Sequence, residues 1–315
     1  MALIPLLTGL FLLSIGRDAA SAQTTVSPDA PRSLVIGRIT GKPSSQYDKL
    51  AAFNQLVVEE LADKNITQSK VLMASSPQEM ADYLKSGKVD YLSETLFTAL
   101  FLEYYGLADI ALREWKGGVS SYHALIIARN DSPVQKLEDL AGGKILFEDR
   151  GSTTGFMLPF VHLRDSGLEF APPPGTEQNT PNDLTYDFTG DETTIVGRVL
   201  RGQADAGVIS NEEWENTKKT PAPFKSNLRV VGQTPDIVRS LVLTRQDLDP
   251  DLKQRLMEVL TSLHKSKRGR AALENYFHVT KFDHFTETVF KQLEWARNSC
   301  DAYGHDLLSF VKETP

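Results

Sequence analysis

The stretch Ser33-Leu-Val-Ile-Gly-Arg-Ile39 sets the fold class together with the residues that follow it. It is a short run of aliphatic and β-branched side chains, which is typical of a buried strand. Over residues 47–63, Phe53, Val57 and Leu61 recur at a spacing that places them on one face of a helix. The two segments therefore predict a strand followed by a helix, the repeating unit of an α/β fold.

The same unit repeats twice more along the next part of the chain. Strands are expected at 70–74 and 89–92, and helices at 77–86 and 97–105. Three such units in succession predict a mostly parallel sheet with helices on both faces.

The α/β pattern restarts after Tyr122. The expected strands are 124–129, 144–147, 204–209, 228–231 and 237–244, the expected helices are 134–140, 151–162, 193–200 and 212–219, and residues 171–185 are expected to form a loop. The remainder of the chain is predicted to be helical over 252–264, 268–276 and 285–310.

These patterns predict an α/β architecture of two lobes with a helical C-terminal tail. The first lobe is expected to be discontinuous, built from residues 33–123 and 238–315, and the second to comprise residues 124–237. The strands at 124–129 and 237–244 are expected to cross between the lobes, because each lies where one α/β series ends and the other begins.

The length, the net charge and the cysteine content of the chain limit which kinds of protein it can be. A chain of 315 residues is about twice the usual ~150 residues of one domain. With 34 basic and 41 acidic residues its net charge is −7, which gives no support to a broad nucleic-acid surface but allows a local anion pocket. The single cysteine, Cys300, excludes an internal disulfide and a cysteine-rich zinc site.

The first 22 residues have the order of a secretory signal peptide. An apolar run over 3–15 is too short to span a bilayer, and Ala20-Ser21-Ala22 supplies the small residues that signal peptidase requires. The run has no preceding Lys or Arg, so an apolar helix or a wrongly assigned start is the alternative. Cleavage after Ala22 would give a secreted enzyme or a periplasmic protein.

The sequence contains none of three common functional motifs in complete form. Residues 151–155 read Gly-Ser-Thr-Thr-Gly, so Thr153 stands where a nucleophile elbow needs serine. The histidines form no His-x-x-x-His pair, and no Walker loop is present. We therefore expect neither an enzyme nor a metal or other cofactor, and a secreted hydrolase is the less favoured reading.

The segment 149–155 instead has the features of an anion cradle. It joins an expected strand to an expected helix, where free backbone N–H groups face outward, and Ser152, Thr153 and Thr154 add three hydroxyls. The flanking glycines permit a ligand to approach the backbone closely. A plain helix cap without a ligand is the alternative.

Five short motifs follow one another along the chain: Tyr91-Leu-Ser-Glu-Thr-Leu-Phe97, Trp115-Lys-Gly-Gly118, Leu137-Glu-Asp-Leu-Ala-Gly142, Gly151-Ser-Thr-Thr-Gly155 and Leu200-Arg-Gly-Gln-Ala-Asp-Ala-Gly207. Their order and spacing resemble those of the phosphate, phosphite and phosphonate substrate-binding family of ABC transporters. The resemblance implies a type II periplasmic-binding-protein fold, a ligand held in an interlobe cleft, and hinge closure recognised by a membrane permease.

The resemblance also implies site residues, one position at a time. They are the cradle residues Ser152, Thr153 and Thr154, two tyrosines that can donate a phenolic O–H, Tyr47 and Tyr122, the strand-end residues Ser93 and Glu94, and Glu212, which corresponds to an acid that takes an amino group. For the tyrosines the alternative is packing, for Glu94 a solvated charge, and for Glu212 a helix cap.

Two departures from the family pattern bear on the ligand. Asp191 stands where relatives have a histidine beside the oxyanion, so either Asp191 is protonated or the ligand is not a full dianion. On the returning strand, an acidic position aligns with Ser240 and its neighbour with Arg239, which is either a bidentate clamp or a surface charge. The second departure, the loss of a carboxylate and the gain of a guanidinium, favours phosphate, phosphite, methylphosphonate or another oxyanion over aminoethylphosphonate.

The function expected from the sequence is capture of a small phosphorus oxyanion in the periplasm for an ABC importer. The alternative is a periplasmic sensor subunit that signals to a membrane histidine kinase. The protein is expected to be a monomer, and Cys300 is expected to lie in the helical tail, away from the cleft.

Overall fold

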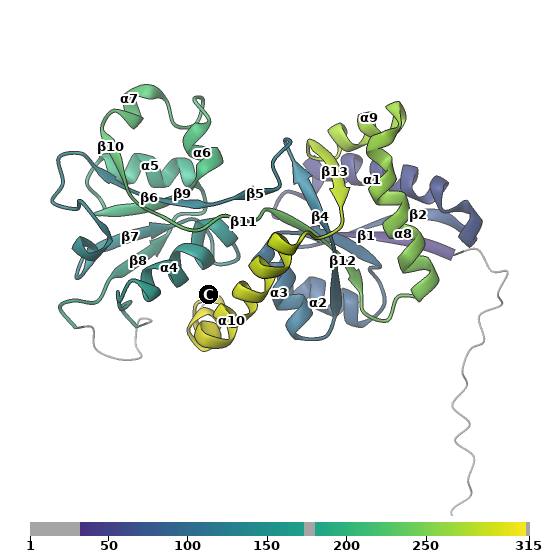
Figure 1. Ribbon diagram of the computed structural model, residues 1–315, viewed down its shortest axis with the longest axis horizontal. Coiled ribbons are helices and arrows are strands. Elements are labelled where there is room, and N and C mark those ends of the chain that lie inside the picture. Colours follow the sequence, from purple (N-terminus) through teal and green to yellow (C-terminus); the bar gives the residue numbers. More distant parts are fainter. Residues whose placement is uncertain (1–31, 173–179, 313–315) are drawn as a thin grey trace, which may run out of the picture. The chain divides into compact units, whose positions relative to one another are not determined.

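The computed structural model describes residues 32–172 and 180–312 (Figure 1). The leader predicted over 1–22 lies outside the described residues. Within the described ranges, no helix combines the length and the apolar character that crossing a membrane requires.

The first sheet has six strands in the order β13-β4-β12-β3-β1-β2. Their bounds are β1 (Arg32–Ile39), β2 (Ile66–Ala74), β3 (Tyr91–Glu94), β4 (Ala108–Lys116), β12 (Ser240–Arg245) and β13 (Val279–Asp283). β1 pairs in parallel with β2 and β3, as the repeated strand and helix units predict. The other three pairings are antiparallel, so the expectation of a mostly parallel sheet is wrong: β12 returns from the second sheet and enters between β3 and β4 in the opposite direction.

Alternating side chains on these strands supply two apolar faces. One face packs against the helices α1 (Pro43–Glu60), α8 (Pro250–Ser262) and α9 (Lys267–Asn275), and the other against α2 (Pro77–Lys85) and α3 (Leu96–Tyr104). Tyr91 belongs to the first core and its neighbour Leu92 to the second, as the two-residue period of a strand requires. α2 begins as predicted: the Ser76 hydroxyl accepts a hydrogen bond from the Glu79 N–H at 3.2 Å.

The second sheet has five strands in the order β10-β6-β9-β7-β8. The strands are β6 (Ala124–Arg129), β7 (Lys144–Phe147), β8 (Thr185–Phe188), β9 (Ala206–Ser210) and β10 (Leu228–Gln233). The helical segments around it are η2 (Leu137–Leu140), the π-helical turn η3 (Thr153–Met157), α4 (Leu158–Asp165), α5 (Glu192–Leu200), α6 (Asn211–Glu215) and α7 (Ala222–Lys225).

The chain passes between the sheets through two short strands. β5 (Ser121–Tyr122) and β11 (Ile237–Val238) pair with each other in an antiparallel, two-stranded sheet. The crossings expected at 124–129 and at 237–244 are therefore corrected: β6 pairs only within the second sheet, and of the second stretch only its first two residues cross before β12 joins the first sheet. The assignment of 33–123 with 238–315 and of 124–237 to two lobes stays a prediction.

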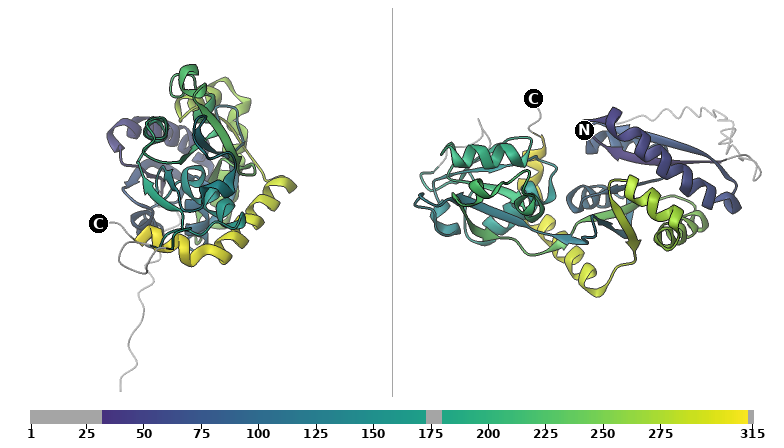
Figure 2. Two further views of the ribbon diagram at one scale, coloured as in Figure 1. Left: turned by 90° about the vertical axis from the view of Figure 1, so that its left-hand side faces the viewer. Right: turned by 90° about the horizontal axis from the view of Figure 1, so that it is seen from above.

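The C-terminal part of the chain is not wholly helical. β13 lies between α9 and α10 (Glu287–Lys312) and adds an edge strand to the first sheet beside β4. α10 then runs past β11, where the Gln292 side chain donates to the Asp236 carbonyl at 3.0 Å, and it can be followed as the yellow helix in both views of Figure 2. Arg297 on α10 forms two 2.8 Å bonds with Glu103 of α3, and the Tyr303 hydroxyl lies 2.6 Å from Asp165 of α4.

A buried amide ties α1 to three strands of the first sheet. The Asn54 side chain is fully buried, and the two hydrogens of its amide nitrogen are shared among three acceptors, the Leu34 and Lys70 carbonyls at 2.9 Å and the Ser69 hydroxyl oxygen at 3.0 Å. Its carbonyl oxygen accepts from the Tyr91 hydroxyl at 2.8 Å. Such groups are costly to bury unless they are all paired, so this node helps to fix how α1 lies on the sheet.

We expect Asn54→Ala to lower the free energy of unfolding by about 2–4 kcal/mol, because it leaves buried hydroxyl and carbonyl groups without partners. Urea denaturation measures the change. The exposed neighbour Gln55→Ala serves as control and should stay within about 0.5 kcal/mol of the parent. Equal effects of the two substitutions would contradict a structural role for the node.

Candidate functional site

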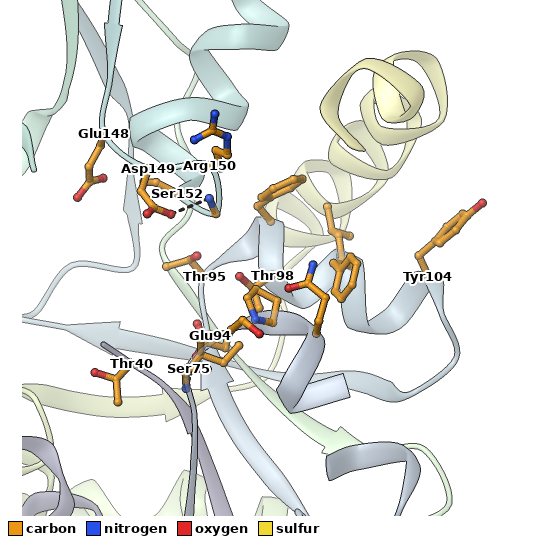
Figure 3. A pocket seen from close by; sticks show the side chains of 18 of the residues that line it. Thr40, Ser75, Glu94, Thr95, Thr98, Tyr104, Glu148, Asp149, Arg150 and Ser152 are labelled. Atoms are coloured by element: carbon orange, nitrogen blue, oxygen red, sulfur yellow. Dashed lines mark hydrogen bonds between the residues drawn. The ribbon is translucent and has the colours of Figure 1, made fainter. Parts of the chain in front are cut away.

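A pocket of about 990 Å³ is lined by residues from both sheets and from α10. The first sheet contributes residues 38–41 at the end of β1, 75–78 at the start of α2, and several residues of 94–105. The second contributes residues 148–152 after β7 and residues 188 and 190 at the end of β8. Figure 3 shows Asp149, Arg150 and Ser152 on one side of the pocket and Glu94, Thr95 and Thr98 on the other. The pocket thus lies beyond the carboxyl ends of the parallel strands, where ligands bind in open α/β sheets.

The amino end of α3 forms part of this wall and is not capped by its own side chains. Thr95 occupies the cap position but its side chain makes no capping hydrogen bond. The Phe97 N–H instead donates to the Thr153 hydroxyl oxygen at 2.9 Å. The Phe97 N–H, at the start of a helix that packs on the first sheet, therefore finds its hydrogen-bond acceptor in a side chain that follows β7 of the second sheet.

The predicted cradle residues take two kinds of position, at the pocket surface and behind it. The Ser152 hydroxyl caps η3 by accepting from the Gly155 N–H at 2.9 Å, and Ser152 lines the pocket. Thr153 and Thr154 are buried, 1% and 4% exposed, behind the pocket surface. Gly155 is required by close approach, since a Cβ there would lie 2.4 Å from a carboxylate oxygen of Glu148.

The tyrosine predicted before the crossing lies beside this cradle. Tyr122 is buried in β5, and burial raises the pKa of its phenol above the usual value, against hydrogen bonds with the Thr154 and Thr153 side chains that lower it. Tyr122 is therefore a neutral O–H group next to the threonines. Tyr47, by contrast, is 50% exposed on α1 and is not among the pocket-lining residues.

The two strand-end residues of β3 point in opposite directions. Glu94 lines the pocket, and one of its carboxylate oxygens accepts from the Ile39 N–H at 3.4 Å. Burial raises its pKa, while Arg38 and Lys116 act in the other direction. Ser93 is 3% exposed and outside the lining, because alternate residues of a strand face opposite sides of the sheet.

Asp191 caps α5 rather than lining the pocket. Its carboxylate accepts from the Thr194 N–H at 2.8 Å and from the Thr194 hydroxyl at 2.6 Å, and these bonds hold the pKa of Asp191 below its usual range. Protonation of Asp191, one of the two alternatives drawn from the sequence, is therefore disfavoured. The neighbouring Gly190 reaches the pocket, whereas the Asp191 side chain is exposed.

Glu212 and Arg239 pair with each other at 2.5 Å. Arg239 also donates to the Lys116 carbonyl at 2.9 Å, so its guanidinium is not an unengaged surface charge. Arg239 is also not among the residues that line the larger pocket. Both residues line a second, smaller pocket instead. Ser240, the first residue of β12, is buried and donates to the Glu114 carboxylate at 3.0 Å.

Two carboxyl groups that the sequence analysis missed line the pockets, Glu148 the larger one and Glu192 the smaller one. Glu148 lines the pocket and contacts Ser152, and burial raises its pKa. Glu192 accepts from the Ser210 N–H at 2.6 Å, and burial, with the Glu148 and Glu213 charges nearby, raises its pKa to about 7. In the segment 190–192 the capping residue is Asp191 and the buried acid is Glu192, a distinction that depends on Ser210 and is not visible locally.

Cys300 lies on the C-terminal helix α10, as expected, but not away from the pocket. It lines the pocket together with Asp301 and Gly304 of α10, so the expectation that it lies away from the cleft is wrong. α10 brings it there by packing beside α3 through the Arg297 and Glu103 pair. Burial raises the pKa of the thiol to about 11, which keeps it protonated near neutral pH. Within the described ranges, no three His, Cys, Asp or Glu side chains gather as metal ligands would.

The chain is similar to known proteins, both to a family as a whole and to individual sequences. Residues 39–290 match the family described as "ABC transporter, phosphonate, periplasmic substrate-binding protein". The phosphate-import protein PhnD of Mycolicibacterium smegmatis is 25% identical over 241 residues, which is 74% of this chain and 73% of that protein.

Solved structures agree in fold. XAC2383 from Xanthomonas citri, solved bound to ATP, superposes with a TM-score of 0.79 at 28% identity, over 87% of this chain and 98% of that chain. PhnD1 from Prochlorococcus marinus in complex with methylphosphonate gives a TM-score of 0.60 at 18% identity, over 87% and 99% of the two chains. The type II periplasmic-binding-protein fold expected from the sequence is confirmed.

The raised pKa of Glu192 predicts how stability changes with pH. A buried acid that keeps its proton up to about pH 7 when folded stabilises the native state below its unfolded pKa, and this contribution is lost as pH rises through 7. The free energy of unfolding of the parent should therefore fall between pH 5 and 8. Glu192→Gln should reduce this fall by on the order of 2 kcal/mol.

Urea denaturation at a series of pH values measures the slope, and Glu60→Gln, at an exposed glutamate near the end of α1, is the matched control. The same slope in the Glu192 variant, the control and the parent would show that Glu192 titrates normally.

Proposed function

The chain belongs to the periplasmic substrate-binding proteins of phosphonate ABC transporters, and from this premise we propose that its larger pocket binds phosphate, phosphite or a small phosphonate beside Ser152 and the amino end of α3. The family carries solutes to an importer, so the partner we propose is a membrane permease. We further propose that residues 1–22 are removed on export and that the mature protein is a monomer.

The observation that carries the proposal is the hydrogen bond between the Phe97 N–H and the Thr153 hydroxyl. It brings the positive amino end of α3 against the segment 152–157, whose own first amides point the same way as those of a helix start. A hydroxyl accepts this donor weakly, whereas an oxyanion oxygen would accept it with a charge-assisted bond about twice as strong. A phosphorus oxyanion can therefore take the place of the Thr153 hydroxyl.

Such a ligand would contact elements attached to both sheets. It would then favour the arrangement in which α3 and the Ser152 segment are both in reach, which is how ligands shift a hinged protein toward a closed state. Tyr122, a neutral donor beside Thr153 and Thr154, is proposed to support the site from behind.

The charges near the pocket favour a ligand without an amino group. Glu212, the acid that corresponds to the amine-binding position in relatives, is already paired with Arg239. Glu94 and Glu148 are biased toward their neutral forms by burial, so an anion beside them meets less repulsion than two ionised carboxylates would give.

Binding without turnover is the proposed activity. No histidine is among the described residues that line the pocket, so Ser152 has no imidazole base beside it there. Among solute-binding roles, import is favoured over sensing because the family is that of a transporter component.

Isothermal titration calorimetry with phosphate, phosphite, methylphosphonate and sulfate tests the proposal. We expect at least one phosphorus oxyanion to bind, and we expect Ser152→Ala to weaken it about tenfold, since it removes a hydroxyl at the site. Ser266→Ala is the matched control: Ser266 caps α9 by accepting from Gly269 at 2.9 Å, as Ser152 does from Gly155, but lies outside the pocket lining. Binding of none of these ions, or equal weakening by both variants, would contradict the proposed site.

A further inference from the structure

Helix α10 contacts elements that pack on both sheets, and it also lines the larger pocket. The Arg297 guanidinium forms two 2.8 Å hydrogen bonds with the Glu103 carboxylate of α3, which packs on the first sheet. Further along α10, the Tyr303 hydroxyl donates to the Asp165 carboxylate of α4, beside the second sheet, at 2.6 Å. Cys300, between these two contacts, lines the pocket. α10 therefore connects the two sheets in addition to the paired strands β5 and β11.

The two contacts lie at the carboxyl ends of the helices that α10 joins. Glu103 is in the last turn of α3, and Asp165 is the last residue of α4. The opposite ends of these helices carry the proposed oxyanion position. The Phe97 N–H lies at the start of α3, and the Thr153 hydroxyl lies at the start of η3, which continues directly into α4. α10 thus ties the two helices together at one end, and the ligand is proposed to bind between them at the other.

The two halves of α10 are attached to the rest of the chain in different ways. The first half is anchored by the apolar side chains of Val289, Leu293 and Ala296, each at most 2% exposed. The attachment to α4 is exposed: Tyr303 is only partly buried, and its ring meets the Phe160 ring edge to face with centroids 6.3 Å apart. A hydrogen bond that water can replace has a small net free energy, so this end of α10 is the one that can separate.

We propose that Tyr303 is a positioning residue for the anion site: by fastening α10 to α4, it keeps the starts of α3 and η3 within reach of one ligand. The inference rests on the proposed function, because it uses the same oxyanion position. It adds that affinity depends on a contact at the far ends of both helices, made by a residue that is not among those lining the pocket. When this contact is broken, the ligand-free protein opens at the site, and only the closed fraction binds with the intrinsic affinity.

Two substitutions at Tyr303 and one control test the proposal. Tyr303→Phe removes the hydrogen bond to Asp165 and keeps the ring, whereas Tyr303→Ala also removes the contact with Phe160. Tyr83→Phe is the matched control, because Tyr83 donates to the Glu79 carboxylate at 2.5 Å in the same manner but within a single helix, α2. Calorimetry with phosphate and methylphosphonate measures affinity, and small-angle X-ray scattering measures the radius of gyration with and without the ion that the parent binds more tightly.

We expect Tyr303→Ala to weaken anion binding about tenfold and Tyr303→Phe about threefold, since one hydrogen bond of ordinary net strength corresponds to roughly the smaller factor. Without ligand, the Tyr303→Ala variant should have a larger radius of gyration than the parent. With saturating ligand the two values should agree, because the ligand then holds the helices together. Tyr83→Phe should match the parent in both measurements.

The inference and the proposed function can fail separately. If the parent binds an oxyanion and Tyr303→Ala binds it equally well, or more weakly with an unchanged radius of gyration, the positioning role is overturned and the proposed function stands. If neither ion binds to the parent, the proposed function fails and the positioning role with it. Circular dichroism melting of each variant confirms that a loss of affinity is not a loss of folding.

Discussion

The site depends on one hydrogen bond, from the Phe97 N–H at the start of α3 to the Thr153 hydroxyl after β7. A helix start has several backbone donors without intrahelical partners, and here the residue at the cap position leaves them to another part of the chain. Thr153 can reach this donor because it begins a π-helical turn, which the Ser152 hydroxyl caps. In this turn Gly155 lies so close to Glu148 that a side chain at position 155 would clash with it. The contact therefore joins the two sheets through the atoms that an oxyanion would use.

The electrostatics of the pocket follow from local dipoles and burial and not from the net charge of −7. Two helical amino ends place partial positive charge at the Ser152 side of the pocket. Glu94 and Glu148 oppose it only when ionised, and burial favours their neutral forms. The acidic net charge therefore does not argue against an anion site in this pocket, whose lining also includes Arg38 and Arg150.

Local signals in the sequence were sufficient for most of the α/β units and for the helix starts at Ser76 and Ser152. The caps at Ser76 and Ser152 depend on residues three positions away, which a sequence displays directly. β4 and β13 were missed because charged residues interrupt their apolar pattern, and these charges are paired only in the fold: Arg113 of β4 forms two 2.8 Å bonds with Asp283 of β13.

The same reason explains why the sequence could not place several side chains around the pocket. Arg239 and Glu212 are far apart in the sequence and neutralise each other only once the chain has returned through β11. Asp191 and Glu192 are adjacent, and only the position of Ser210 decides which of them is buried. The position of α10 beside α3, which brings Cys300 to the pocket, likewise depends on a long-range ion pair.

A crystal structure of the protein with methylphosphonate tests the central claim most directly. The account predicts a phosphonate oxygen within hydrogen-bonding distance of the Phe97 N–H, in place of the Thr153 hydroxyl, with Ser152 at a second oxygen. A ligand bound elsewhere, with the bond between Phe97 and Thr153 intact, would contradict it.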